Sequence, residues 1–596
     1  MILIFGGTTE GRIAAETCDT AGKPFYYSTK GETQEINMIN GLRLTGAMTS
    51  SEIATFCVAN DIRCVIDAAH PFAENLHRSL AEAERTCLEL NHKITVIRMM
   101  RSFAKTDVRA IRCDTYSDAV KKMEDSGVKR LLALTGVNTL EKLKPFWSRH
   151  VTFFRILNRK ESIDIAKNLC FPSENIIFFN DDVTLPTTED ESELMRRLNV
   201  DAIITKESGD SGGFRAKVEA AAQSGIMTFI IRRPSPPDSF VQVTGRHTLR
   251  RAIEHYLPDF FPLRTGLTTG ACATAATKAA LQALLSSDTS ESVSFALPDG
   301  ETLTIPILST TTGPSYAESA VKKESGDDPD ITNGCIIHSR VSRGAHGIRF
   351  LQGTGVGTVT LPGLGIEVGE PAINTTPRKM ITEAIRELSD EDFDITISVE
   401  NGENLAKHTF NPRVGVIGGI SIIGTSGIIH PLSNDAFKDS IKREIEVAKA
   451  IGCEEIAFTS GKKSEDILRE SKDIRCIHHG NFIGETLKYA FDLGFRDVTL
   501  AIMIGKAVKL AEGHLDTHSH KVTMNKSFMK ELALSHGCSQ AVCDVIDDIT
   551  LARELWSRLE KDDLRLFIEA ITQECQRHCE TVFPEGNLTV VVIKEK

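Results

Sequence analysis

The sequence predicts a two-lobed α/β arrangement in the N-terminal half of the chain, and an α+β domain followed by a small α/β domain in the C-terminal half. Apolar strand-like runs alternate with amphipathic helical segments over residues 1–257, which is typical of parallel sheets. Residues 264–412 combine a helix rich in small residues with successive β-rich segments, which indicates hairpins. Strands and helices alternate again over 413–596.

The N-terminal half contains short apolar runs bounded by glycine and polar residues, and we expect them to form Rossmann-like parallel sheets. The candidate elements are strands at 2–5, 64–67, 94–98, 131–134, 202–205 and 227–231 and helices at 73–90 and 214–223. A break near residues 100–130 predicts two lobes with a cleft between them. A proline-rich turn at 233–237 precedes a helix near 247–257, and residues 258–263 are interpreted as a linker.

The C-terminal half starts with a helix and continues through short strands. The candidate elements are a helix at 272–285 and strands at 293–297, 302–307, 334–341, 356–361 and 395–399, then strands at 414–417, 456–459, 476–478, 498–504 and 588–593. We therefore place an α+β domain at 264–412 and an α/β domain at 413–596.

Bulk composition is that of a globular protein with an acidic balance. The chain has 596 residues, a net charge of −12 and no concentrated basic arm, so we expect no nucleic-acid partner. The apolar stretch at 414–429 is shorter than the ~18 residues of a membrane span. The 14 cysteines lack paired zinc-site spacing, so we expect reduced thiols, no protein-bound metal and a cytoplasmic location.

A glycine-rich turn follows the first strand and opens a helix. Residues 6–11 read Gly-Gly-Thr-Thr-Glu-Gly, where a dinucleotide pyrophosphate can lie against backbone N–H groups. The turn lacks the middle glycine of the strict fingerprint, so a simple strand-to-helix turn is the alternative. The candidate cofactor-binding residues are Gly6, Gly7, Thr8, Thr9 and Gly11.

Two further polar turns follow candidate strands of this half. Residues 67–73 read Asp-Ala-Ala-His-Pro-Phe-Ala, and residues 205–213 read Thr-Lys-Glu-Ser-Gly-Asp-Ser-Gly-Gly. Sites of α/β proteins form at the carboxyl ends of strands, which makes His70 and Lys206 candidate catalytic residues. A histidine that caps the following helix is the alternative for His70.

Together, these three segments resemble the precorrin-6A reductase family over residues 1–257. The resemblance implies reduction of a ring double bond in a corrin precursor with NADH or NADPH, cofactor contacts in the glycine turn, and a site lined by His70 and Lys206. His70, Lys206 or water then delivers the proton. The substrate carries many carboxylates, and its candidate clamps are Arg98, Arg101, Arg155, Arg159 and Arg215.

A second glycine- and threonine-rich opening begins at Arg264 and precedes an alanine-rich helix. Small residues allow close packing or close approach of a ligand, and a well-capped core helix is the alternative. Further glycine-rich segments follow in order at 355–364, 369–378, 418–427 and 505–511, and residues 517–519 read Thr-His-Ser.

In this order the segments resemble the cobalt-precorrin-5B C1-methyltransferase family over residues 263–596. The resemblance implies S-adenosylmethionine as methyl donor, which we place near residues 418–427, and a secondary base at His518 or Asp516. The candidate cofactor-binding residues are Gly418, Gly419, Gly424, Thr425 and Gly427. The candidate substrate-binding residues are Arg264, Thr268, Thr269, Arg343, Arg349, Arg378, Lys506 and Lys509. Thr523 stands where the family leads us to expect an aspartate.

The two families catalyse consecutive steps, so the sequence predicts a bifunctional enzyme acting on cobalt-corrinoid intermediates. The main alternative is that one half is catalytic and the other only binds corrinoid. A nucleotide kinase is disfavoured because neither turn ends in Gly-Lys-Ser/Thr. A metal hydrolase built on His514, His518 and His520 is a third alternative. The sequence leaves homo-oligomerisation open.

Overall fold

The computed structural model describes residues 1–31, 36–101, 110–179, 186–207, 213–286, 289–518 and 521–594. Packing divides the chain into two units. The first comprises Met1–Arg264 and Asp299–Leu303, and the second comprises Thr265–Pro298 and Thr304–Lys596. Across the described residues, no helix combines the length and apolar character needed to cross a membrane.

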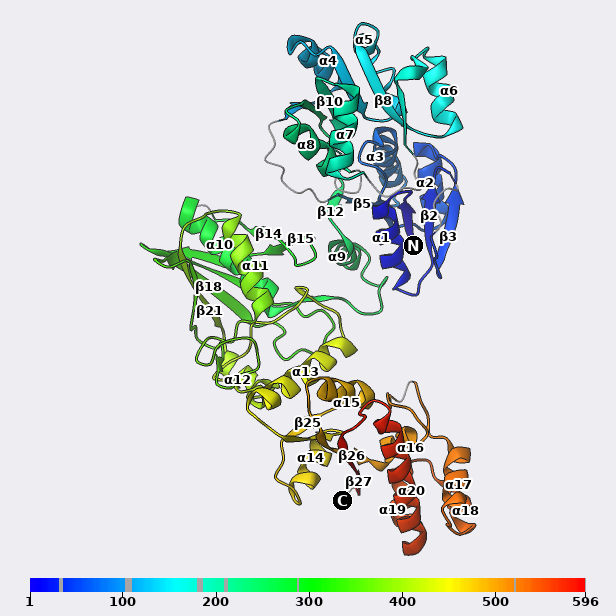
Figure 1. Cartoon of the computed structure of the whole chain (residues 1–596), viewed down its shortest axis with the longest axis vertical. Coiled ribbons are helices and arrows are strands. Elements are labelled where there is room, and N and C mark those ends of the chain that lie inside the picture. Colours follow the sequence, from blue (N-terminus) through cyan, green and yellow to red (C-terminus); the bar gives the residue numbers. More distant parts are fainter. Residues whose placement is uncertain are drawn as a thin grey trace. The chain divides into compact units, whose positions relative to one another are not determined.

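Two six-stranded sheets form the first unit, and neighbouring strands in both sheets are parallel (Figure 1). The first has the order β12 (Val241–Val243), β5 (Thr95–Met99), β4 (Cys64–Asp67), β1 (Ile2–Phe5), β2 (Phe25–Thr29) and β3 (Gly41–Thr45). The second has the order β6 (Ile111–Cys113), β11 (Met227–Ile231), β10 (Ala202–Lys206), β7 (Arg130–Leu134), β8 (Val151–Leu157) and β9 (Ile176–Phe179). The predicted two-lobed α/β class is confirmed.

Helices cover both faces of each sheet, which is why the central strands are apolar on both sides. Ile2 and Ile4 pack with α1 (Thr9–Asp19) and α9 (Arg246–Tyr256), whereas Leu3 and Phe5 pack with α2 (Ser50–Ala59) and α3 (Glu74–Glu89). Around the second sheet lie α4 (Tyr116–Asp125), α5 (Lys144–Trp147), α6 (Lys160–Asn168), α7 (Thr188–Leu198) and α8 (Phe214–Gln223).

The chain passes between the two sheets twice. Strand β12 follows the second sheet in sequence, yet it pairs with β5 at the edge of the first sheet. Helix α9 comes next and packs against α1. The expected linker at 258–263 is itself packed: Phe260 and Phe261 are buried with α9, and the Arg250 guanidinium lies 4.3 Å from the Phe261 ring centroid.

The second unit begins with an α+β domain around a long buried helix, α10 (Thr269–Ser286). Beside it lies a mixed sheet with the order β16 (Ser309–Thr312), β17 (Tyr316–Lys322), β18 (Ile336–Arg343), β21 (Phe393–Val399) and β19 (Ile348–Leu351). Other elements are β14 (Ser292–Ala296), β15 (Thr302–Pro306), α11 (Thr375–Arg386) and α12 (Gly402–Ala406). Alanine, threonine and glycine dominate α10, so that β17, β18 and α11 can approach it closely.

The segment after residue 412 returns to this α+β domain. Strand β22 (Val416–Ile417) pairs with β20 (Thr358–Val359), and β23 (Ile428–Ile429) pairs with β13 (Gly266–Leu267). Hydrogen bonding therefore extends the α+β domain beyond the expected boundary at 412. The predicted strand at 414–417 is shortened because residues 411–414 form a 3₁₀ turn.

A small parallel sheet with the order β25 (Cys476–His478), β24 (Glu455–Thr459), β26 (Asp497–Met503) and β27 (Asn587–Ile593) completes the second unit. It carries α13 (Asn434–Ala450), α14 (Lys462–Arg469), α15 (Ile483–Asp492), α16 (Ile504–Ala511), α17 (Lys526–Ser535), α18 (Ala541–Asp548), α19 (Leu555–Arg558) and α20 (Lys561–Glu580). The predicted α/β class is confirmed here as well.

A buried ion-pair network links the 3₁₀ turn at 411–414 to this sheet. Arg413 contacts Glu444 of α13 at 2.9 Å and Glu465 of α14 at 3.0 Å, and it donates a hydrogen bond to the Cys476 carbonyl at 2.7 Å. His478 also contacts Glu465, at 2.7 Å. Both carboxylates are buried, and Glu444 depends on the Arg413 guanidinium for compensation, whereas Glu465 also pairs with Arg469 at 2.8 Å.

Replacing Arg413 with methionine is expected to lower the free energy of unfolding by about 3–5 kcal/mol, because the buried Glu444 loses its partner and Glu465 loses one of its partners. Urea unfolding of the full chain, followed by circular dichroism, measures the change. The matched control is Lys462→Met, whose ion pair with Asp466 is exposed, so its loss is expected to leave the midpoint nearly unchanged. Equal midpoints for the two variants would contradict the role given to Arg413.

Candidate functional site

The glycine turn and the His-Pro turn meet at the point where the order of the first sheet reverses. The chain runs outward from β1 to β2 and β3 on one side, and to β4 and β5 on the other. Ligands of open α/β sheets bind at the carboxyl ends of strands beside such a point. The Thr8 hydroxyl donates a hydrogen bond across it to the Ala68 carbonyl at 2.6 Å.

Close packing explains two glycines of the first turn. A Cβ at Gly6 would lie 2.1 Å from the Tyr27 hydroxyl oxygen, and a Cβ at Gly11 would lie 2.8 Å from the Gly6 Cα. The Gly7 amide donates to the Tyr27 hydroxyl, and the Thr8 hydroxyl accepts from the Gly11 amide. These groups hold the turn in place and are engaged within the protein.

The same turn retains features that fit a phosphate. Gly7 has a φ of +91°, and a Cβ there would meet open space. Within the described part of the chain, no group accepts a hydrogen bond from the Thr9 and Glu10 amides at the start of α1. The negative charge of Glu10 is compensated by Arg101, 2.9 Å away. A helix N-terminus with such amides attracts anions.

Water reaches the His70 ring, although protein atoms surround much of it. Its Nδ1 accepts a hydrogen bond from the Phe72 amide at 3.2 Å, so the neutral ring carries its proton on Nε2. Burial, together with the positive charges of Arg101, Lys206 and Arg98, lowers the pKa of His70 to about 4. At neutral pH the ring is a neutral hydrogen-bond donor.

Lys206 reaches the same place from the second sheet. It ends β10, beside the point where the order of that sheet reverses between β7 and β10. Its Nζ lies 5.3 Å from the centroid of the Phe72 ring, so the two lobes bring Lys206 and His70 together around Phe72. Burial and the charge of Lys142, against Glu74, lower the pKa of Lys206 to about 8. The predicted loop at 208–212 lies outside the described residues.

Beneath this region the charges are strongly paired. Asp67 is fully buried and contacts Arg98 and His77, each at 2.7 Å. Among the predicted clamps, Arg155 pairs with Glu191 and Arg215 pairs with Glu219, whereas Arg159 is exposed. A small pocket beside Pro71 is lined by Arg98, Arg101 and Arg233, of which Arg98 is paired with Asp67 and Arg101 with Glu10.

A cavity in the described part of the second unit has a volume of about 530 Å³. This lies within the ~300–1,000 Å³ typical of small-molecule sites. Its wall includes the predicted residues Thr268, Thr269, Gly424 and Thr425. Apolar side chains from Leu364, Val414, Val416, Ile420, Ile423 and Ile428 cover part of the wall.

Thr269 bonds the start of α10 to the segment around residue 423, and Thr268 caps the first turn of the helix. The Thr269 hydroxyl accepts from the Ile423 amide at 2.8 Å, and the Thr268 hydroxyl accepts from the Ala271 amide at 3.1 Å. A Cβ at Gly424 would lie 2.4 Å from the Thr268 hydroxyl oxygen. This tight fit shapes the cavity floor.

The other predicted glycines serve packing or turns. A Cβ at Gly419 would lie 2.4 Å from the Gly355 carbonyl oxygen, and one at Gly427 would lie 2.6 Å from Leu297. Gly418 has a φ of +83° and Gly427 one of +85°. None of the three lines the cavity.

Three of the predicted arginines of the α+β domain form ion pairs with carboxylates that do not line this cavity. Arg343 pairs with Glu391, Arg349 pairs with Asp394, and Arg378 pairs with Glu370 at 2.6 Å. Arg378 also donates to the Ile373 carbonyl at 2.8 Å. Arg264 is exposed at the end of the first unit. Their substrate-binding role stays a prediction.

The C-terminal sheet gathers a second group of predicted residues. Lys506 and Lys509 lie one turn apart on α16 and donate to the carbonyls of Gly480 and Thr517, respectively. Burial and the charge of Lys509 lower the pKa of Lys506 to about 8. Burial raises the pKa of Asp516, but Lys521 at 2.7 Å and the His518 amide outweigh this and lower it.

Sequence reasoning missed the buried His479, which lies between β25 and α15 near this group. Its ring is fully buried, and burial with the charges of Lys506 and His478 lowers its pKa to about 3. The position after a parallel strand is the only signal in the sequence that favours it. Sequence reasoning also missed the charged residues of α13 that line the large cavity.

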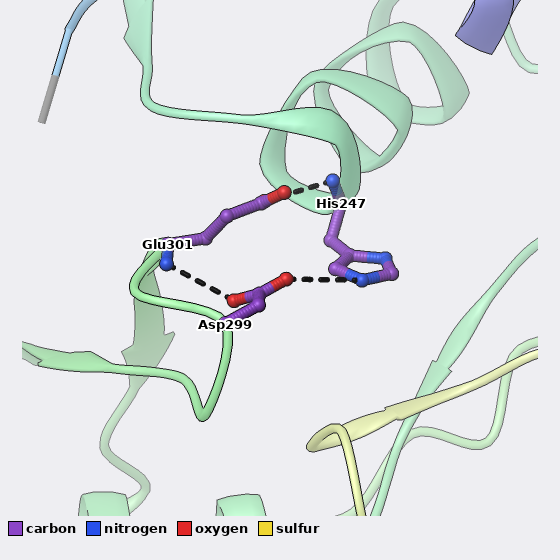
Figure 2. Close-up of side chains that lie close together, drawn as sticks. All are labelled: His247, Asp299 and Glu301. Atoms are coloured by element: carbon purple, nitrogen blue, oxygen red, sulfur yellow. Dashed lines mark hydrogen bonds and ion pairs between the residues drawn. The ribbon is translucent and has the colours of Figure 1, made fainter. Parts of the chain in front are cut away.

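One group of described side chains has the spacing of a metal site: His247, Asp299 and Glu301 (Figure 2). The Glu301 carboxylate, however, accepts hydrogen bonds from the backbone amides of Arg246, His247 and Thr248 at 2.6, 2.8 and 3.3 Å. The Asp299 carboxylate contacts the His247 ring at 3.4 Å and accepts a hydrogen bond from the Glu301 amide at 3.0 Å. The cluster is a cap on the first turn of α9, since Glu301 satisfies amides that a helix leaves unpaired. His520 of the predicted histidine cluster lies outside the described residues.

Family models match both halves of the chain. The model described as precorrin-6x reductase CbiJ/CobK matches residues 1–255. The CbiD model matches residues 258–431, and the model of the CbiD C-terminal domain matches residues 516–596. The boundaries agree with the division into two units at residue 264.

Named relatives match the second half. A cobalt-precorrin-5B C(1)-methyltransferase of Prosthecochloris aestuarii is 41% identical over 345 residues, covering 56% of this chain and 94% of the relative. One from Pseudomonas syringae pv. syringae is 45% identical over 267 residues, covering 43% and 72%. The crystal structure of a cobalamin biosynthesis protein (CbiD) from Archaeoglobus fulgidus is 30% identical and covers 44% and 83%, with a TM-score of 0.25. A structure of CobK precorrin-6A reductase is 19% identical and covers 43% and 97%, with a TM-score of 0.35.

Folds and matches together define a fusion of a two-lobed reductase domain with a methyltransferase, two enzyme types of cobalamin biosynthesis. The chain belongs to the CbiD family, and it carries a CbiJ/CobK-type domain ahead of the CbiD region. The resemblances read from the sequence are confirmed.

Replacing Glu301 with alanine is expected to destabilise the protein by about 1–2 kcal/mol, because three amides of α9 lose their acceptor. Thermal unfolding measures the difference. The control is Glu291→Ala, an exposed change that is expected to stay within about 0.5 kcal/mol. A loss for E301A no larger than that of the control would rule out the cap.

Proposed function

We propose that the chain catalyses two consecutive steps of cobalamin biosynthesis. Its second half transfers a methyl group from S-adenosylmethionine to C1 of cobalt-precorrin-5B, and its first half reduces the resulting cobalt-precorrin-6A to 6B with NADH or NADPH. The observation that carries this proposal is the succession of the two family matches along one chain. The substrates are cobalt-corrinoid intermediates, and the location is cytoplasmic.

In the reductase half, the turn at residues 6–11 would hold the cofactor phosphates through the Thr9 and Glu10 amides, with Gly7 leaving room for close approach. The cofactor supplies the hydride when bound. Arg98, Arg101 and Arg233 beside Pro71 would bind substrate carboxylates.

Lys206 is the proton donor of the reduction. An ammonium with a pKa of about 8 is largely protonated at neutral pH and gives up its proton readily. The neutral His70 ring has no such proton to give, so it orients the substrate through Nε2–H instead. The Phe72 ring, 5.3 Å from Lys206 Nζ, keeps the ammonium group beside His70.

In the methyltransferase half, the cavity of about 530 Å³ would hold S-adenosylmethionine, with Thr268, Thr269, Gly424 and Thr425 in its wall. The cofactor supplies the electrophilic methyl group when bound. Alignment of that methyl with the ring carbon provides most of the catalysis. Lys506 and Lys509 are proposed to hold substrate carboxylates, and Asp516 or His518 to take the proton.

Anaerobic incubation of the pure protein with cobalt-precorrin-5B, S-adenosylmethionine and NADPH or NADH is expected to add one methyl group and then two hydrogens to the tetrapyrrole. Mass spectrometry follows both changes. Methylation without reduction would make the N-terminal half a corrinoid-binding module. An unchanged mass, with a control enzyme working on the same substrate, would refute the proposed function.

Lys206→Met is expected to slow reduction of the corrin by about 10²–10⁴-fold without weakening NADPH binding, because the proton donor is lost. In the wild type the rate should fall as pH rises through about 8, since Lys206 then loses its proton. Stopped-flow pH profiles measure both effects. Lys142→Met removes a like charge and should move this fall to higher pH. An unchanged profile in K206M would exclude Lys206 as donor.

A further inference from the structure

One face of α13 lines the large cavity with charged side chains. Asp435, Asp439 and Arg443 follow one another at intervals of four residues, so they form a stripe along the helix. On a solvent-exposed helix, an aspartate and an arginine four residues apart are expected to pair. Here no ion pair joins Asp439 to Arg443 at contact distance.

Arg443 is half-buried, and within the described chain it has neither a hydrogen bond nor an ion pair. The Asp439 side chain is 50% exposed, and its one ion pair among the described residues is a distant contact of 3.9 Å to the exposed Lys442. Within the described chain, the Arg443 guanidinium therefore lines the cavity without a carboxylate partner, and the Asp439 carboxylate has no closer cation than Lys442. Charged groups that are partly removed from water without a partner indicate a site for a charged ligand.

The remaining charges of the wall decide which ligand fits. Lys323 is buried and neutralised by Asp330 at 2.6 Å. Apart from this neutral pair, the charged or titratable side chains of the cavity wall are the acidic Asp328, Asp435 and Asp439 and the basic Arg443 and His430. An acidic wall repels a corrinoid with its many carboxylates, and it favours a ligand with a net positive charge.

We infer that Asp439 and Arg443 bind the amino-acid end of S-adenosylmethionine, with its ammonium at Asp439 and its carboxylate at Arg443. Side chains four residues apart on a helix begin about 5–6 Å apart at Cβ, which suits two groups attached to one carbon. The apolar wall around Val416 and Ile420 then receives the adenosyl part. This inference rests on the proposed use of S-adenosylmethionine and names the residues that recognise it.

The test compares two probes that differ in the amino-acid end: S-adenosylhomocysteine, which has it, and 5′-methylthioadenosine, which lacks it. Isothermal titration of the full chain is expected to give tighter binding of S-adenosylhomocysteine. Arg443→Gln should weaken S-adenosylhomocysteine about 10–100-fold, as for one lost charge-assisted contact, and leave methylthioadenosine unchanged. Asp439→Asn should act in the same direction.

Lys449→Gln is the matched control, since Lys449 is exposed on the same helix, contacts the Gly494 carbonyl rather than Asp439 and does not line the cavity. It should change neither affinity. If R443Q leaves the ratio of the two affinities as in the wild type, the inference is overturned while the proposed cofactor stands. If the wild type binds neither probe, the proposed use of S-adenosylmethionine itself fails. Thermal unfolding of each variant verifies that it is folded.

Discussion

The direction of the strands is the constraint on which the N-terminal site depends. Because neighbouring strands in each of its sheets are parallel, their carboxyl ends lie at one edge, and the turns that follow them are the places where polar side chains can gather. The bond from Thr8 to the Ala68 carbonyl joins two such turns. The return of β12 to the first sheet ties the lobes together, which allows Lys206 and His70 to approach the same Phe72 ring.

The cavity of the second unit is built on another principle. It is not at a sheet edge but between the start of α10, the segment around residue 423 and one face of α13. Threonine hydroxyls and a glycine with no room for a Cβ hold the first two of these together. A polar floor, an apolar wall and a charged rim result, and such a combination can orient a small amphipathic ligand.

Electrostatics separates the tasks within the chain despite its net charge of −12. Arg98 and Arg101 beside Pro71 are paired with carboxylates, the lysines of α16 donate to backbone carbonyls, and the cavity beside α13 carries more acidic than basic side chains. Burial also tunes individual groups. It moves the pKa of Lys206 toward neutrality, where the group can donate a proton, and it keeps His70 and His479 neutral.

The sequence alone determined the fold classes and most strands, because apolar runs between glycine and proline turns are local signals that a parallel sheet preserves. It also determined the glycine turn, His70 and Lys206, since each follows such a run directly. Only the tertiary structure decided that Phe260 and Phe261 are core residues, that 416–429 belongs to the α+β domain, and that Glu301 caps α9. Likewise, only the tertiary structure decided that Asp439 and Arg443 line a cavity. A charged stripe has the same spacing on an exposed helix and on a cavity wall, and only the packing of distant segments distinguishes the two.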